Sequence, residues 1–411
     1  MKIGEFAQKH NITQDTVRHY MDLGLLVTEK SGGQYDFSEV DSHDLTQIIE
    51  LKKLNFSLNE IQKILTIQRI SGTNTNTFRT LFTTFLENKK REVDIKLMKY
   101  NKFNELLKEK IKEIKSTEIK DVKRFGFPIT SLHLLVCPKC QSALKLSEGT
   151  IEEDNVMDAN LKCSCGYEAV IRNGIFIYEE SVRTKMLNGK VMPSKEEYLA
   201  SSSYEYNNFL YKGMNAMIEI INRCGIEPEY IMEMDNCVGF FLLQYIRYIP
   251  KNSVYVLIDY DIERIIKLKH DLEMYYEHNN FIFLCCDYDS LPIKRSSMDI
   301  LIDYNMSENY EKYTGEILFD KVLPLMKDNG IITGSYYYLG ENSSDKIMNQ
   351  KTLNRYNKNN CIDRFNKYKL KLISTSDIGP VAGGSLFNNE LKGINEVRLY
   401  QSIYACRKIL G

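Results

Sequence analysis

Several features that would assign this 411-residue chain to a broad class are missing from its sequence. No apolar run approaches the ~20 residues of a membrane-spanning helix, and the first residues lack the order of a secretory signal. The net charge of −1 gives the chain no general attraction to nucleic acid or to a membrane surface. No internal repeat of fixed period is present. We therefore expect a cytoplasmic protein that does not associate with membranes.

The cysteines also argue against one class of protein. Ten cysteines are spread along a long chain rich in Lys, Asn and Ile, which is not the pattern of a small, disulfide-bonded secreted domain. We expect them to be reduced. The chain is too long for one hydrophobic core and should hold two to four domains.

The sequence starts with the pattern of a helix-turn-helix. A short helix with one apolar face precedes a turn at residues 10–11, and Thr13 is suited to cap a second helix. Val17 and Tyr20 repeat at helical spacing in that second helix, and Gly24 is placed to end it in the left-handed region. Two short helices joined by a tight turn can place the second one in the major groove of DNA.

A wing and two further helices follow in the first seventy residues. The sequence Ser-Gly-Gly at 31–33 predicts a hairpin tip, so residues 26–37 are expected to form a two-stranded wing. Asp41 or Ser42 is expected to cap the next helix. Residues 57–60 have the order of a capping box and predict the start of another helix.

The outward face of the second helix and the wing supply the predicted DNA contacts. Arg18 can pair with guanine or with phosphate, and Gln14 can read adenine. The alternative is a small helical domain that binds protein. The 8 basic and 10 acidic residues in positions 1 to 70 favour that alternative. The full predicted set is Gln14, Thr16, Arg18, His19, Tyr20 and Tyr35.

The order of these elements over residues 1–70 resembles the winged helix-turn-helix of the MerR family of bacterial transcription regulators. The resemblance implies a homodimer that binds double-stranded promoter DNA at a palindromic site and acts together with RNA polymerase. It also implies activation by distortion of the promoter. The family usually carries Tyr-Arg after the wing glycine, and this chain has Gln34 and Tyr35 there. The missing charge should weaken binding and flatten its salt dependence.

A long helix is predicted over residues 78–122. Residues 78–119 contain neither Gly nor Pro, and apolar residues recur every seven positions, which is typical of a coiled coil. The main series is Leu86, Val93, Tyr100, Leu107 and Ile114, and a partial second series is Phe82, Leu97 and Ile111. The alternative is a helix packed along its own domain. The MerR resemblance implies that this helix pairs antiparallel with that of a second chain.

Residues 132–180 predict a small β domain held by zinc. Cys137 and Cys140 form a Cys-x2-Cys pair, and Cys163 and Cys165 form a tighter Cys-x-Cys pair. Four thiolates in two close pairs can complete a structural zinc site. The segment resembles zinc ribbons that accompany some methyltransferases. A redox switch and a catalytic zinc are the alternatives.

Residues 198–411 alternate strands with helices, which predicts a doubly wound α/β domain with a mainly parallel sheet. The fold class is therefore multidomain, with an all-α winged helix-turn-helix and coiled-coil helix, a β zinc ribbon and this α/β domain. The expected strands are 230–234, 254–259, 281–287, 298–302, 330–334, 369–374 and 398–406.

The succession of strands resembles the class I S-adenosylmethionine-dependent methyltransferases. The resemblance implies cofactor contacts from Glu233 and Gly239 near the first strand, from Asp259 to the ribose, and from Asp287 to the adenine. Where the family has two further glycines in the first loop, this chain has Asp235 and Cys237, which are side chains that would intrude on the ligand. No catalytic residue is identified.

Two functions from different classes follow from these patterns. The first is a transcription regulator whose methyltransferase-like domain senses an unknown small-molecule effector. The second is an enzyme that methylates a small molecule or RNA and carries a DNA-binding regulatory domain. In a third arrangement the sheet binds an inducer that has no relation to the methyl donor.

Overall fold

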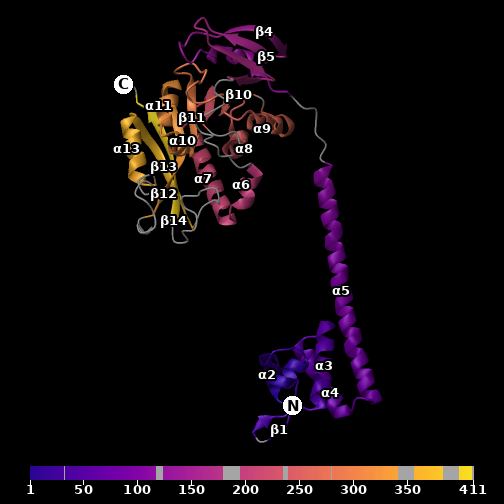
Figure 1. Ribbon diagram of the computed structural model, residues 1–411. Coiled ribbons are helices and arrows are strands. Elements are labelled where there is room, and N and C mark those ends of the chain that lie inside the picture. Colours follow the sequence, from indigo (N-terminus) through magenta and orange to yellow (C-terminus); the bar gives the residue numbers. More distant parts are fainter. Residues whose placement is uncertain are drawn as a thin grey trace. The chain divides into compact units, whose positions relative to one another are not determined.

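A computed structural model describes residues 1–31, 33–116, 124–178, 195–234, 239–278, 280–340, 356–382 and 398–409. The chain divides into two compact units, Met1–Glu118 and Ile119–Gly411, and each is considered by itself (Figure 1). Among the described residues, no helix is both long enough and apolar enough to cross a membrane.

The N-terminal unit contains short helices, a small hairpin and one long helix. Thr13 caps the second helix as predicted, and Ser57 forms the predicted capping box with Glu60. The third helix starts earlier than expected, because Ser38 caps it and Asp41 completes the capping box. The elements are α1 (Ile3–Lys9), α2 (Gln14–Asp22), β1 (Lys30–Ser31), β2 (Gln34–Tyr35), α3 (Glu39–Lys53), α4 (Leu58–Ser71) and α5 (Asn76–Lys115).

One hydrophobic core joins these elements. Phe6, Val17, Leu45 and Ile61 come from four different helices and are fully buried together. The start of α5 closes this core with Phe78. Burial of one apolar face from each helix stabilises the unit far more than the intrinsic propensity of such short helices would.

The C-terminal unit contains one large sheet with helices on both faces (Figure 1). Its first elements are β3 (Phe127–Pro128), η1 (Ile129–Leu134), β4 (Lys145–Glu152), β5 (Asn155–Lys162), β6 (Glu168–Arg172), β7 (Ile175–Ile177), α6 (Lys195–Ser201), α7 (Tyr204–Arg223), β8 (Tyr230–Glu233), α8 (Phe240–Tyr245), η4 (Ile246–Tyr248), β9 (Val254–Asp259) and α9 (Ile262–Tyr275). The rest are β10 (Phe281–Cys285), β11 (Met298–Tyr304), α10 (Met306–Thr314), α11 (Leu318–Val322), η5 (Leu323–Leu325), β12 (Met326–Leu339), α13 (Lys358–Lys367), β13 (Leu370–Ala382) and β14 (Arg398–Lys408).

The strand order confirms the predicted doubly wound arrangement. The strands follow one another as β13-β14-β12-β11-β8-β9-β10, and the pairs from β12 to β10 are all parallel. β14 runs antiparallel to both of its neighbours. The chain proceeds outwards from β8 in both directions, so β8 and β11 flank the point where ligands bind in such sheets.

The two faces of the sheet are covered by different helices. Consecutive residues of a strand point to opposite faces of the sheet. Ile231 and Met232 on β8 therefore belong to different hydrophobic clusters. Helices α7, α8 and α9 pack on the face of Ile231, and α10, α11 and α13 pack on the face of Met232. Because both faces are covered, the central strands are apolar almost throughout.

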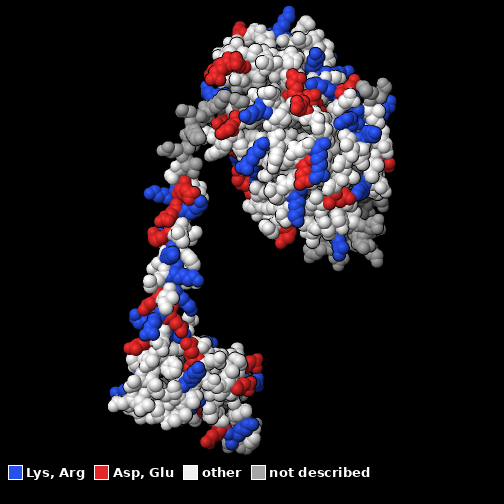
Figure 2. Space-filling model, turned by 180° about the vertical axis from the view of Figure 1, so that it is seen from behind, with Lys and Arg blue, Asp and Glu red and all other residues white. Residues whose placement is uncertain are grey.

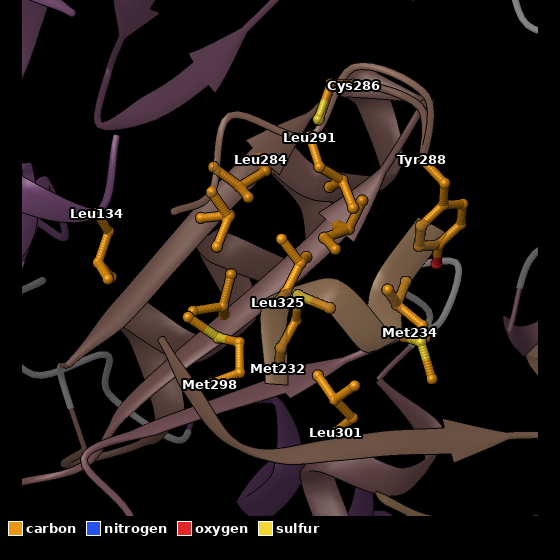
Figure 3. Packing of buried hydrophobic residues seen from close by; sticks show 14 of the residues in the cluster. Leu134, Met232, Met234, Leu284, Cys286, Tyr288, Leu291, Met298, Leu301 and Leu325 are labelled. Carbon is orange, nitrogen blue, oxygen red and sulfur yellow. The ribbon is translucent and has the colours of Figure 1, made fainter. Parts of the chain in front are cut away.

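The predicted zinc ribbon is continuous with this sheet. β7 pairs in parallel with β10, and β6, β5 and β3 extend the sheet beyond it. The amide of Val136 donates to the carbonyl of Pro292 (2.9 Å), and the amide of Lys294 donates to the carbonyl of Leu134 (2.9 Å). Leu134 joins the same buried cluster as Leu284 (Figure 3). Residues 132–180 and 198–411, which the sequence predicts as two domains, thus lie within one compact unit.

Candidate functional site

Helix α2 presents an exposed polar face. Thr13 accepts a hydrogen bond from the amide of Thr16 (3.1 Å), which fixes the start of the helix. Gln14, Arg18 and His19 are exposed, and Thr16 is partly exposed. Arg18 and His19 lie on the side of α2 that faces away from the buried Val17 and Tyr20, and Gln14 and Thr16 lie at the edges of this polar face.

Arg18 is held in an exposed ion pair. Its guanidinium lies 2.8 Å from a carboxylate oxygen of Asp15, and the two side chains are 58% and 89% exposed. Ion pairs with this exposure contribute roughly 0 to 1 kcal/mol. Arg18 can therefore leave Asp15 and bind a phosphate or a guanine at a small cost in free energy.

Tyr20 does not share the exposure of its neighbours. It is 4% exposed and packs in the core of the unit, and Lys52 donates to its hydroxyl (3.3 Å). Its aromatic ring therefore supports α2 from behind. This position differs from the DNA contact that the sequence predicts for Tyr20.

The wing is shorter than the predicted 26–37 hairpin and pairs only β1 with β2. Lys30 lies directly opposite Tyr35, and its ammonium lies 4.8 Å from the centre of the Tyr35 ring. Tyr35 is 39% exposed. Motif-based reasoning did not single out Lys30, although the hairpin register places it beside the predicted contact.

Helix α4 fixes the end of α2. Gln62 donates to the carbonyl of Leu23 (2.7 Å), and Arg69 donates to the carbonyl of Leu25 (2.6 Å) and to Asp44 (2.6 Å). Gly24 has a φ of +67°, the left-handed conformation predicted for the residue that ends α2. The bonds to Leu23 and Leu25 join α4 to the turn after α2, and the bond to Asp44 joins α4 to α3, so the exposed face of α2 is held in one orientation.

The four predicted cysteines come together in the C-terminal unit. The sulfur atoms of Cys137, Cys140, Cys163 and Cys165 all lie within 4.8 Å of one another. Each pair bends back on itself in a tight turn, and Gly166 supplies a left-handed residue (φ +87°) after the second pair. Two thiol pairs that face each other at this separation can hold a metal ion.

The environments of the four thiols differ. Cys137 and Cys163 are buried, and Cys140 and Cys165 are exposed. Hydrogen bonds from Ser142 lower the pKa of Cys140 to about 6, and burial raises the pKa of Cys137 to about 12. The thiol of Cys140 therefore ionises more easily than that of Cys137.

Three predicted cofactor-binding acids lie at the carboxyl ends of neighbouring strands or just beyond them. Glu233 ends β8 and is 1% exposed, and the Tyr255 hydroxyl donates to it (2.6 Å). Asp259 ends β9, is 2% exposed and accepts from the amide of Asp261 (2.9 Å). Asp287 follows β10 and accepts from the hydroxyl of Ser290 (2.6 Å). All three carboxylates are thus tied to local groups.

The loop after β8 is only partly described. Gly239 has a φ of +70° and precedes α8, and a Cβ atom built there would lie 2.8 Å from Leu268. The left-handed backbone therefore favours glycine at this position. Asp235 and Cys237, which replace two glycines of the family, lie outside the described residues.

A further acid lies at the end of β11, next to β8. Asp303 is 2% exposed and accepts from the amide of Ser307 (2.8 Å) and from the hydroxyl of Tyr404 (2.9 Å). Burial raises the pKa of Asp303. Its contacts hold the start of α10 against β14, which assigns it a structural role.

Comparison with known proteins separates the two units. Residues 1–68 match the family described as "MerR HTH family regulatory protein". The HTH-type transcriptional regulator HmrR of Rhizobium leguminosarum bv. viciae is 32% identical over 68 residues, which are 16% of this chain and 53% of the relative. The mercuric resistance operon regulatory protein of Bacillus cereus is 40% identical over 68 residues, or 16% of this chain and 50% of the relative. The chain thus spans about half the length of these curated relatives.

Solved structures overlap a different part of the fold. MccD protein has a TM-score of 0.39 at 13% identity and covers 48% of this chain and 96% of its own. The N-methyltransferase NodS of Bradyrhizobium japonicum WM9 has a TM-score of 0.34 at 9% identity and covers 50% of this chain and 98% of its own. Both likenesses are too distant to bear on function.

The family match, the relatives and the local geometry agree on the N-terminal unit. Its capped α2, wing and supporting helices occur in the order that the sequence predicts, over the residues that the family covers. Residues 1–68 of this chain are therefore a helix-turn-helix domain of the MerR family.

Proposed function

We propose that this chain is a dimeric transcription regulator of the cytoplasm that binds palindromic promoter DNA and acts together with RNA polymerase. The observation that carries the proposal is the exposed polar face of α2, which is capped by Thr13 and held by bonds from α4. The proposed contacts are Gln14, Thr16, Arg18 and His19 on α2, with Lys30 and Tyr35 on the wing. We assign Tyr20 to the support of α2.

The long helix α5 supports the dimer. Its 40 residues extend for about 60 Å at the rise of an α-helix. Many of its apolar side chains are exposed, and acidic and basic side chains alternate along it (Figure 2). A helix whose apolar stripe is exposed within its own unit favours a partner helix, and a second copy of the chain also supplies the contact to the second half-site.

We propose structural zinc for the cluster of Cys137, Cys140, Cys163 and Cys165. Zinc prefers four thiolates in a tetrahedral arrangement, and the sulfur separations fit such a site. When bound, the ion would hold the two turns of the ribbon together. The continuity of β7 with β10 means that this support extends to the large sheet.

We propose that the C-terminal unit senses a small-molecule effector at the carboxyl ends of its parallel strands. S-adenosylmethionine is the first candidate, because Asp259 and Asp287 lie at that edge. The second candidate function is methyl transfer to a small molecule or RNA, and the same two acids favour it. The substituted glycines at positions 235 and 237 oppose both the enzyme and the unmodified cofactor site.

The DNA-binding proposal is tested with Arg18→Ala in the full-length chain. We expect at least about tenfold weaker binding to the operator and a salt slope lower by about 0.9 for each phosphate that is no longer neutralised. Fluorescence anisotropy titrations at several salt concentrations measure both quantities. Asp15→Ala is the matched control, because it frees Arg18 and removes a negative charge from the same face. Equal affinity and equal salt slopes for parent and Arg18→Ala would reject the assignment.

The effector proposal is tested by calorimetric titration of the zinc-loaded chain with S-adenosylmethionine and with its demethylated product. Binding that Asp259→Ala abolishes would support cofactor sensing or methyl transfer, and incubation with radiolabelled methyl donor would separate these two. Absence of heat and of thermal stabilisation by either compound would exclude both, and would leave a sensor for another ligand.

A further inference from the structure

Beyond its first turns, helix α5 has an apolar stripe that none of the described residues of its own unit covers. Phe82 and Leu86, which the sequence places in the coiled-coil series, pack partly against the core of the N-terminal unit instead. The exposed stripe starts after them, with side chains that are 46% to 66% exposed. These residues are Val93, Leu97, Tyr100, Leu107, Ile111 and Ile114.

The spacing within this stripe is regular. The positions alternate steps of four and three residues, which is the seam of a two-stranded coiled coil. One position of the seam is polar, because Asn104 falls between Tyr100 and Leu107 and is exposed. A covered Asn that lacks a hydrogen-bond partner is costly, so Asn104 limits which residue can lie opposite it.

We propose that a second copy of this chain covers the stripe in an antiparallel alignment that places Tyr100 opposite the partner's Asn104. This inference rests on the dimer proposed above and specifies its register. The Tyr100 hydroxyl can then hydrogen-bond the Asn104 amide, twice in the symmetric dimer. The same alignment places Leu97 opposite the partner's Leu107 and Val93 opposite the partner's Ile111. Ile114 lies opposite the partner's Lys90, whose aliphatic stem can cover it while the ammonium stays in solvent.

The residues that flank the seam favour this alignment. Phe103 lies nearest the two-fold axis and meets its own copy, which adds an aromatic pair at the centre. Asp94 lies near the partner's Lys108, and its present contact with Lys90 (2.9 Å) is exposed and easily exchanged. The alignment also brings Lys96 near the partner's Lys110, at the solvent-exposed edge, where salt screens the repulsion.

Other alignments are less favourable for identifiable reasons. A shift by one heptad would put Asn104 opposite the partner's Leu107 and leave the amide without a hydrogen bond. A parallel pair would place Lys90 against its own copy within the seam. It would also bring Lys110 close to the partner's Lys115.

The register is tested with Phe103→Cys in the full-length, zinc-loaded chain. Mild oxidation should link this variant to its own copy, and the dimer band on a non-reducing gel should exceed that of the parent, whose ten cysteines set the baseline. Lys110→Cys is the matched control, one heptad further along the same side of the helix. It should remain at the baseline, because its own copy lies about 20 Å away along the axis.

A second pair of variants tests the role of the polar layer. Asn104→Leu should tighten the dimer several-fold and lower the yield of the Phe103→Cys crosslink, because apolar layers permit several registers. Tyr100→Phe, which removes only the hydroxyl, should weaken the dimer several-fold. An unchanged Phe103→Cys crosslink yield in Asn104→Leu, together with an unchanged dimer affinity of Tyr100→Phe, would contradict the proposed pairing.

The outcomes separate this inference from the function on which it rests. If sedimentation shows a monomer at all concentrations, the dimer itself is wrong, and the register fails with it. If sedimentation shows a dimer but Phe103→Cys stays at the baseline, or Lys110→Cys crosslinks equally well, only the register is overturned.

Discussion

Loss of the ion pair between Glu60 and Lys89 should loosen the attachment of α4 to α5. The Lys89 ammonium lies 2.8 Å from a carboxylate oxygen of Glu60, and the two side chains are 11% and 30% exposed. The hydrogen bond from Lys89, together with those from Ser57, lowers the pKa of Glu60 to about 2 from the usual 4.5. This difference corresponds to roughly 3 kcal/mol. Because solvent reaches Glu60, we expect Glu60→Gln to remove only about 1 to 2 kcal/mol at neutral pH.

The sign of the pH dependence follows from the lowered pKa. Ionised Glu60 stabilises the folded unit above pH 4.5, and this contribution is lost as the pH falls from 4.5 towards 2. The parent and Glu60→Gln should therefore differ at pH 7 and converge near pH 2. Gln keeps the shape of the capping box, so the variant isolates the charge.

Hydrogen exchange of the α4 amides in the full-length chain measures the local opening free energy of each variant. Glu92→Gln is the matched control, because Glu92 also contacts Lys89 (2.9 Å) but is 55% exposed. It should change the opening free energy by less than about 0.5 kcal/mol. An equal effect of the two variants, or a Glu60→Gln effect that persists unchanged at pH 2, would refute this reasoning.

Three further variants test the packing and the metal site. The Phe176 side chain on β7 is fully buried, so Phe176→Ala should lower the free energy of unfolding by about 3 to 5 kcal/mol, as measured by urea denaturation. A decrease below about 1 kcal/mol would show that β7 does not share the core of the sheet. Cys163→Ser should lose the bound zinc and lower the melting temperature of the C-terminal unit, which metal analysis and calorimetry can measure. If the variant still binds one zinc ion per chain, Cys163 is not a zinc ligand. Tyr20→Phe should lower the free energy of unfolding by at most about 1 kcal/mol and change the affinity for the operator less than twofold. A large loss of affinity at unchanged stability would show that Tyr20 contacts DNA.

Local chemistry made much of the fold predictable from the sequence. The capping residues Thr13 and Ser57 are recognisable because a hydroxyl must satisfy the amides at a helix start. The cysteine pairs are recognisable because each is close in sequence, and the fold brings the two pairs together. The alternation of apolar strands and amphipathic helices was sufficient to predict the doubly wound sheet.

Long-range pairing was less predictable. The strands of the ribbon were expected, but no local pattern indicates that β7 adds to the edge of β10. Tyr20 illustrates a second limit, because the sequence predicts it both among the apolar residues at helical spacing and among the DNA contacts. The structure buries Tyr20 with the apolar residues, because α2 packs on the core through this side chain. The spacing of Phe82 and Leu86 likewise predicts a coiled coil, although these residues pack against the core of their own unit.

The most direct test of the proposed function is selection of DNA sites from a random pool by the purified, zinc-loaded chain, followed by footprinting of the enriched site. A dimeric regulator of the MerR type should enrich an inverted repeat, protect both half-sites together and bind with two chains per site. Arg18→Ala should lose this enrichment. Failure to enrich any sequence, or enrichment of a single unrepeated site bound by one chain, would contradict the proposal.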